Sequence, residues 1–309
     1  MKIVFMGTSQ FAVPSLKVLI SSQYEIAGVV SQPDRPKGRG RKLSPTPIKL
    51  VAESFNLPVY QPLKIKEAES VNYIKAWEPD LIVVVSYGQI IPPAILDYPC
   101  LGCINVHASL LPRYRGAAPI QRALMAGEKT TGVSTMFMDA GLDTGDIILQ
   151  EKVDIEDNTN HGELEEFLAS KGALLLLDTI ERLTAGTAFR RKQDDNESSY
   201  ASRLMKEDEV INWADSAWAI HNQIRALSPA PGAYAYINEF KVKIYNSRVL
   251  GNTESGVVGE IISIEKEGFV VQTGKGTLQV IELQKEGKKR MNASDFLKGF
   301  KLKPGTLMV

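Results

Sequence analysis

Short apolar runs alternate with segments of helical spacing up to about Ala185. Leu81 to Val85 is wholly aliphatic, which is typical of a central strand covered on both faces. His161 to Thr184 repeats its apolar positions with a helical period and predicts a long amphipathic helix. Further predicted strands are Lys2–Gly7, Ile26–Val30, Gly102–His107, Val133–Met138 and Ile147–Val153, and further predicted helices are Phe11–Ile20, Thr46–Phe55 and Ala117–Ala126. This alternation predicts an α/β fold with a Rossmann-like, open and mostly parallel sheet.

The pattern changes after about Ala185. Residues 186–205 are polar and carry no long apolar period, which indicates a linker. A helix is predicted at Ser216–Leu227, and short alternating segments follow it at Ala233–Ile237, Val242–Val249, Val257–Ile264, Phe269–Gln272 and Thr277–Leu283. Such closely spaced strands indicate a small β-barrel or sandwich. We therefore expect two domains, residues 1–190 and 206–309, joined by a linker at 191–205, as a chain of 309 residues favours.

Charge is balanced overall but uneven along the chain. There are 36 basic and 36 acidic residues, so any basic surface has to be local. The loop from Arg35 to Lys42 holds five cations in eight residues, and a second basic run lies at Lys285 to Arg290. Cations spaced by glycine can follow a phosphate backbone, although charge runs are often only solvated.

The sequence also bears on the cellular location and the oligomeric state of the protein. No apolar run approaches the twenty residues of a membrane span, so no membrane partner is expected. The chain starts directly with folded pattern instead of a signal peptide and holds only two cysteines, which favours the cytoplasm. We expect a monomer, because nothing in the pattern indicates an obligate oligomer.

Polar residues of complementary chemistry cluster around one predicted strand end. Asn105 and His107 are two positions apart, so both side chains face the same side of the strand. Asp143 lies between glycines in the run Gly141 to Gly145, where the backbone can approach a ligand. An amide, an imidazole and a carboxylate suit acyl transfer to an amine, in which an oxyanion has to be stabilised and a proton moved. Spacing alone leaves a strand-end Asn, a core His and a turn Asp equally open.

The long loop after His107 is the second candidate feature. Its run from Ser109 to Arg122 is punctuated by Pro and Gly and leads into a helix, which favours a functional loop over a plain connection. Cys100 and Cys103 form a single CxxC with no second pair, so a zinc site would lack ligands and no metal is expected. The chain also lacks the glycine patterns of a dinucleotide or Walker-type site.

Taken together, these motifs resemble the folate-dependent formyltransferases. The resemblance rests on SLLPRYRGAAPIQRAL, on SQPDRPKGRGRKL upstream and on GLDTGD downstream, and it extends over nearly the whole chain. It implies that Asn105, His107 and Asp143 are the catalytic trio, and that a folate site is lined by Ser109, Leu110, Leu111 and Pro112. The implied donor is 10-formyltetrahydrofolate.

The same resemblance implies the acceptor, the amino group of initiator methionyl-tRNA. The tail then resembles an OB-like barrel that holds the tRNA, and the loop around Arg39 resembles a segment that engages its acceptor end. The residues expected to contact tRNA are Lys37, Arg39, Arg41, Lys42, Lys288, Lys289 and Arg290. Three alternatives stay open: formyl transfer to a small amine such as an amino sugar, hydrolysis of the formyl donor, and an RNA-binding protein whose α/β domain is only a scaffold.

Overall fold

The computed structural model describes residues 1–37, 42–251 and 256–309. The chain forms two compact units, each assembled from separate stretches of sequence. The N-terminal unit comprises Met1–Gly116, Thr130–Asp154 and Glu165–Ala201, and the C-terminal unit comprises Ala117–Lys129, Ile155–Leu164 and Ser202–Val309. The expected division into a folate-binding part, residues 1–190, and a tRNA-binding part, residues 206–309, stays a prediction.

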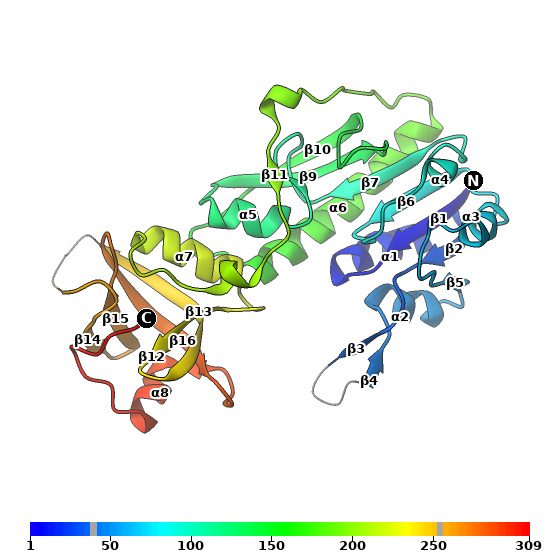
Figure 1. Ribbon diagram of the computed structural model, residues 1–309. Helices are drawn as coiled ribbons and strands as arrows, with labels where there is room; N and C mark the ends of the chain where they lie inside the picture. The colour runs from blue at the N-terminus through cyan, green and yellow to red at the C-terminus, as the bar shows by residue number, and fades with distance from the viewer. Residues whose placement is uncertain (38–41, 252–255) are drawn as a thin grey trace. The chain divides into compact units, whose positions relative to one another are not determined.

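The N-terminal unit is built on a seven-stranded sheet in the order β10-β9-β7-β6-β1-β2-β5 (Figure 1). Its strands are β1 (Lys2–Gly7), β2 (Glu25–Val30), β5 (Val59–Tyr60), β6 (Leu81–Val85), β7 (Cys103–His107), β9 (Thr130–Phe137) and β10 (Ile147–Asp154). The five strands from β5 to β7 are parallel, whereas β9 runs antiparallel to both β7 and β10. The predicted open, mostly parallel sheet is confirmed.

Helices cover both faces of this sheet, as its apolar central strands require. On one face, α3 (Ala68–Lys75) and α4 (Pro93–Leu96) contribute Ile74 and Ile95 to a buried cluster with Val4 and Val84. On the other face lies α6 (His161–Thr184), whose residues from Glu165 on belong to this unit. A Cβ added at Gly172 would lie only 2.8 Å from Val106 Cγ1, so this glycine lets α6 approach β7 closely.

Two shorter α-helices, α1 (Val13–Ile20) and α2 (Pro47–Ser54), and the short helix η1 (Gln10–Ala12) also belong to the N-terminal unit. The short helix η1 leads into α1, which follows β1. In α2, the Thr46 hydroxyl accepts a hydrogen bond from Lys49 N at 3.1 Å, and Pro47 occupies the first turn. This is the N-cap that the sequence predicts.

The segment 31–45 differs from the expected plain loop. It contains a hairpin of β3 (Arg35–Lys37) and β4 (Lys42–Ser44), which projects from the N-terminal unit (Figure 1). Asp34, at the base of the hairpin, accepts hydrogen bonds from Gln61 and Lys49, both at 2.7 Å. These two bonds, that from Gln61 foremost, hold the pKa of Asp34 below its usual value. Strands of three residues are too short to show alternation in the sequence.

The polar segment expected to be a linker also has defined structure. Within it, η2 (Asp195–Glu197) precedes β11 (Tyr200–Ala201), and β11 pairs in parallel with β8 (Arg115–Gly116). Gln193 is buried, with 7% of its surface exposed. The segment is therefore anchored to the loop that follows β7.

The C-terminal unit contains an antiparallel sheet in the order β12-β13-β16-β15-β14, with β17 paired to β16. The strands are β12 (Ala233–Ile237), β13 (Phe240–Gly251), β14 (Ile261–Glu265), β15 (Gly268–Gln272), β16 (Thr277–Lys285) and β17 (Met291–Asn292). Near the C-terminus, Met308 bridges to Ile237 at the end of β12, and Leu307 bridges to Glu260 beside β14. These bridges join the two edges of the sheet, which gives the OB-like barrel that was predicted.

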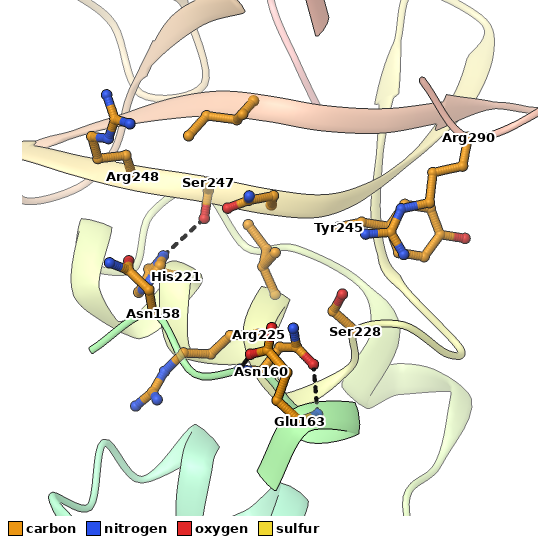
Figure 2. Close-up of a pocket in the computed structure, with 13 residues that line it drawn as sticks. Asn158, Asn160, Glu163, His221, Arg225, Ser228, Tyr245, Ser247, Arg248 and Arg290 are labelled. Carbon is orange, nitrogen blue, oxygen red and sulfur yellow. Dashed lines mark hydrogen bonds between the residues drawn. The ribbon is translucent and has the colours of Figure 1, made fainter. Parts of the chain in front are cut away.

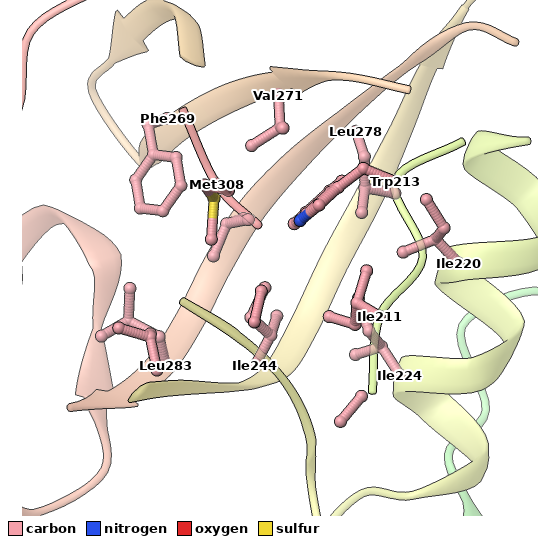
Figure 3. Packing of buried hydrophobic residues seen from close by; sticks show 14 of the residues in the cluster. Ile211, Trp213, Ile220, Ile224, Ile244, Phe269, Val271, Leu278, Leu283 and Met308 are labelled. Atoms are coloured by element: carbon pink, nitrogen blue, oxygen red, sulfur yellow. The ribbon is translucent and has the colours of Figure 1, made fainter. Parts of the chain in front are cut away.

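Three helices and one short helix accompany this sheet: α5 (Pro119–Met125), α7 (Ala217–Ala226), α8 (Ala293–Gly299) and η3 (Lys206–Glu209). Figure 3 shows how Ile220 and Ile224 of α7 point into the barrel core toward Ile244 and Leu278. Trp213 is 4% exposed and packs in the same cluster as Met308. Among the residues described, no helix is long and apolar enough to cross a bilayer.

Candidate active site

The candidate trio is gathered on one face of the N-terminal sheet. Asn105 and His107 alternate with Val106 along β7, so Val106 faces α6 and the two polar side chains face the opposite side. His107 is 6% exposed, and Asn105 is partly exposed. Within the described part of the chain, the Asn105 side-chain amide has no hydrogen-bond partner, so it is available to a ligand.

The ring orientation of His107 is set by a backbone carbonyl. His107 Nε2 lies 2.9 Å from Tyr114 O. A carbonyl oxygen only accepts, so Nε2 carries the hydrogen in this contact. The other ring nitrogen, Nδ1, then faces Asp143 Oδ2 at 3.6 Å. With its hydrogen on Nε2, the ring presents the Nδ1 lone pair toward that carboxylate, so a proton can be held between Nδ1 and Oδ2.

Asp143 reaches His107 through an unusual loop. Because β9 runs antiparallel to β7, the loop after β9 begins beside Ile104 and has to fold back over the sheet toward His107. Asp143 has φ of 55°, a left-handed conformation that Asp tolerates better than most residues. Gly116 N donates a hydrogen bond to Asp143 Oδ2 at 2.8 Å. The carboxylate is therefore aimed by a backbone amide as well as by its own loop.

This arrangement combines an oxyanion donor with a proton-accepting pair. The Asn105 amide can donate to an oxygen that becomes negative when a nucleophile attacks a carbonyl carbon. The His107–Asp143 pair can take the proton that the nucleophile releases. Both functions lie on one face of β7, as acyl transfer requires.

The predicted folate-binding residues form a rigid loop directly after β7. Ser109 is fully buried, and its carbonyl accepts from Ser134 Oγ at 2.6 Å. Leu111 N donates to Ser134 Oγ at 3.1 Å, and Leu111 O accepts from Gln150 Nε2 at 3.0 Å. Leu110 and Pro112 are partly exposed. The buried members thus hold the loop, while Leu110 and Pro112 present surface.

Two residues that support the trio had no such role predicted from the sequence. Gln193 donates to the carbonyls of Asp143 and Gly145, and Arg115 donates to Gln193. Arg115 was part of the motif after His107 but had no assigned role, and Gln193 lay in the expected linker. A single glutamine in a polar stretch gives no periodic signal.

The predicted cations of the hairpin are only partly described. Lys37 ends β3 and Lys42 begins β4, and these two positions pair with each other. Arg39 and Arg41 lie outside the described residues. Lys37 and Lys42 belong to the N-terminal unit, to which the trio also belongs.

The other predicted cations lie in the C-terminal unit. Lys288 and Lys289 are exposed and have no ion-pair partner among the residues described. Arg290 differs, because its guanidinium forms two hydrogen bonds to the Glu282 carboxylate and lies 4.4 Å from the centre of the Tyr245 ring. Its charge is already balanced, whereas those of the two lysines are not.

Arg290 also lines a polar pocket of about 340 Å³ in this unit (Figure 2). Arg225 and Ser228 contribute from α7 and its C-terminal end, and Asn158 and Arg248 contribute further polar groups. Arg248 pairs with Glu267 at 3.1 Å. The lining therefore offers amide and guanidinium donors, and two of its arginines are already ion-paired, which suits a polar ligand better than an apolar one.

His221 closes one side of the same pocket. Its Nε2 lies 3.0 Å from Asp157 O, so Nε2 donates, and its Nδ1 then accepts from the Ser247 hydroxyl at 3.0 Å. Burial, more than the neighbouring Arg225, lowers the pKa of His221. The ring is thus a neutral structural link between α7 and β13.

Neither cysteine takes part in a metal site that the structure describes. Cys100 is exposed, and Cys103 is buried with its thiol near the carbonyls of Ile95 and Leu96. Burial raises the pKa of Cys103 to about 12, so its thiol stays protonated. Over residues 1–37, 42–251 and 256–309, no group of three or more His, Cys, Asp or Glu side chains is arranged to hold a metal.

Comparison with known proteins places the chain among relatives of the same architecture. A sequence model of the formyl transferase family matches residues 1–180, and one of the formyl transferase C-terminal domain matches residues 203–301. The chain belongs to the formyl transferase family. A methionyl-tRNA formyltransferase of Syntrophomonas wolfei is 62% identical over 309 residues, with 100% of this chain and 98% of that protein covered. One from Citrifermentans bemidjiense is 49% identical over 308 residues, covering 100% and 96%.

Solved structures share the fold at lower identity. The sugar 3N-formyl transferase WlaRD, crystallised with dTDP and 5-N-formyl-THF, has a TM-score of 0.68 at 22% identity and covers 94% of this chain and 99% of its own. A methionyl-tRNA formyltransferase of Clostridium thermocellum has a TM-score of 0.57 at 21% identity, covering 81% and 94%. At these identities, the solved structures show that the fold is shared.

Proposed function

We propose that this protein transfers the formyl group of 10-formyltetrahydrofolate to the amino group of initiator methionyl-tRNA. The observation that carries the proposal is the meeting of Asn105, His107 and Asp143 on one face of β7. It occurs in a chain whose relatives, at 47–62% identity over nearly their full length, are named methionyl-tRNA formyltransferases. The trio supports formyl transfer as the chemistry, and the names of the relatives support methionyl-tRNA as the acceptor.

In the proposed reaction, the amine nitrogen of the methionyl group attacks the formyl carbon. A new C–N bond forms, and the formyl oxygen becomes an oxyanion to which the Asn105 amide donates. The proton released by the amine passes to the His107–Asp143 pair. When the tetrahedral intermediate collapses, the bond to N10 of the folate breaks and the His107–Asp143 pair gives its proton to N10, so no net charge or redox change remains.

The folate is assigned to the loop after β7. Two structural neighbours were crystallised with a folate, WlaRD in the presence of 5-N-formyl-THF and HypX of Aquifex aeolicus in complex with tetrahydrofolic acid. In this chain, Leu110 and Pro112 offer partly exposed surface on a loop that Ser134 and Gln150 hold rigid. A rigid loop orders no further on binding, which favours affinity. The mechanism uses no metal.

The RNA is assigned to cations in both units. Lys288 and Lys289 are exposed cations of the C-terminal unit without an ion-pair partner among the described residues, and Arg290 presents its paired guanidinium to the polar pocket. Lys37 and Lys42, with Arg39 and Arg41 between them, would contact the same RNA. Phosphate contacts of this kind supply affinity through counterion release. We assign the folate chemistry and the RNA contacts of the hairpin to residues 1–190, and the remaining RNA contacts to residues 206–309, in a monomer of the cytoplasm.

Two substitutions test the proposal. Asn105→Ala removes the oxyanion donor, and kcat should fall about 10²- to 10³-fold. Asp143→Asn removes the proton-accepting carboxylate, with an expected loss of about 10²- to 10⁴-fold. Binding of methionyl-tRNA, measured by filter retention, should stay unchanged in both.

Matched controls separate chemistry from surface effects. Asn72→Ala changes an exposed amide, and Asp178→Asn changes a partly exposed carboxylate that pairs with Arg182 on α6. Both lie away from the trio and should leave kcat unchanged. Retention of full activity by either trio variant, or loss of tRNA binding in both, would contradict the assigned roles.

A further inference from the structure

The Asp143 loop needs support beyond its own sequence. Asp143 adopts a left-handed conformation, which persists only where surrounding contacts hold it. The loop also has to fold back from the end of β9 to reach His107. Small movements of a reacting group are costly, because about 1 Å of misplacement can reduce a rate about 100-fold.

Gln193 supplies that support from a segment distant in sequence. Its side-chain Nε2 donates to Asp143 O at 2.8 Å and to Gly145 O at 2.7 Å. Both carbonyls belong to the loop that carries the carboxylate. With 7% of its surface exposed, Gln193 makes these bonds away from solvent, where they are hard to replace by water.

Arg115 determines which way the Gln193 amide points. Arg115 Nε and Nη2 both donate to Gln193 Oε1, at 3.0 and 2.9 Å. A guanidinium cannot accept, so Oε1 has to face Arg115 and the NH₂ group has to face the two carbonyls. Arg115 is itself 1% exposed, and Asp195 Oδ1 balances its charge at 2.9 Å.

Three consecutive residues therefore hold both acid–base members of the trio. Tyr114 O accepts from His107 Nε2, and Gly116 N donates to Asp143 Oδ2. Arg115, between them, fixes the backbone of Asp143 through Gln193. The strand pair β8–β11 joins this tripeptide to the segment that carries Gln193.

We infer that Gln193 is a positioning residue for Asp143, oriented by Arg115, and that the segment 189–201 is part of the catalytic architecture. The inference rests on the proposed function, because positioning is measured by formyl transfer. It predicts that full activity requires the NH₂ group of Gln193, which donates to the Asp143 loop, and that the Oε1 atom facing Arg115 is not enough by itself.

Two substitutions at one position distinguish these requirements. Gln193→Ala removes both contacts. Gln193→Glu has nearly the same shape and still accepts from Arg115, but it presents no donor to the carbonyls of Asp143 and Gly145. Both variants should lower kcat about 10- to 100-fold with little change in KM for tRNA.

Gln223 provides a matched control in the C-terminal unit. Its Nε2 also donates to two backbone carbonyls, those of Asp208 at 2.9 Å and Val210 at 2.8 Å. Gln223→Ala removes the same kind of contact away from the trio, so kcat should stay at the wild-type value. Thermal unfolding of all three variants shows whether they remain folded at the assay temperature.

Hydrogen exchange of the Gly116 amide gives a readout that does not depend on activity. This amide donates to Asp143 Oδ2, so a loosened loop should raise its exchange rate in Gln193→Glu but not in Gln223→Ala. Wild-type kcat together with unchanged Gly116 exchange in Gln193→Glu would overturn the inference. If the wild-type protein transfers no formyl group at all, the proposed function fails instead, and Gly116 exchange still tests the positioning contact.

Discussion

Replacing Gly145 by alanine tests whether the placement of the Asp143 loop limits the reaction. A Cβ added at Gly145 would lie 1.9 Å from Phe137 O, and the carbonyl belongs to the last residue of β9. Real Cβ contacts essentially never fall below 3.0 Å, so the loop and the strand end have to separate by at least 1.1 Å. The obstacle is backbone, which cannot turn aside as a flexible side chain can.

The expected consequence follows from that displacement. Asp143 lies two residues before Gly145, and the Gln193 side chain donates hydrogen bonds to the backbone carbonyls of both residues, so a shift at Gly145 also moves Asp143. A shift of about 1 Å should lower kcat about 100-fold, which corresponds to about 2.7 kcal/mol of transition-state stabilisation. Overpacking of this kind should also reduce the free energy of unfolding by about 1–3 kcal/mol.

The assay measures kcat for formyl transfer at saturating methionyl-tRNA and 10-formyltetrahydrofolate, with urea unfolding measured in parallel. Gly299→Ala is the matched control, because a Cβ there meets nothing within 4 Å and its backbone lies outside the left-handed region. It should change neither quantity. Wild-type kcat in Gly145→Ala, in a protein destabilised as expected, would refute the argument that loop placement limits the rate.

Two further predictions concern the RNA and acid stability. Replacing Lys288 and Lys289 together by alanine should make the plot of log affinity for tRNA against log salt less steep, by about 1 in slope for each phosphate that is no longer neutralised. The control is Lys298→Ala, which removes a lysine that is ion-paired with Asp295 and should leave the slope unchanged. If the double variant keeps the wild-type slope, the two lysines do not contact the RNA. Burial lowers the pKa of His161 to about 4 from 6.5. Between these values the unfolded chain binds one proton more, so stability should fall by up to about 1.4 kcal/mol per pH unit as pH drops, and His161→Gln should flatten that slope in urea titrations.

Elements with a strong local pattern were predictable from sequence. The helix His161–Thr184 and the strand Leu81–Val85 have the bounds that their apolar spacing indicated. The Thr46 cap was also readable, because its contact spans three residues. In such cases the residues that decide the structure lie within the segment itself.

The contacts that complete the site are long-range, and a local pattern cannot reveal them. Gln193 meets Asp143 across 50 positions and Arg115 across 78. The pairing of Arg290 with Glu282 likewise depends on how β16 and β17 fold together. The sequence thus pointed to the candidate trio through its motif, whereas the contacts that hold Asp143 in place are visible only in the structure.

Formyl transfer from 10-formyltetrahydrofolate to methionyl-initiator tRNA tests the central claim most directly. Uncharged initiator tRNA, free methionine and an amino sugar serve as competing acceptors in the same assay. The account predicts N-formylmethionyl-tRNA as the product, with no transfer to the other three. Release of formate to water, transfer to the small amines, or binding of tRNA without any transfer would contradict it.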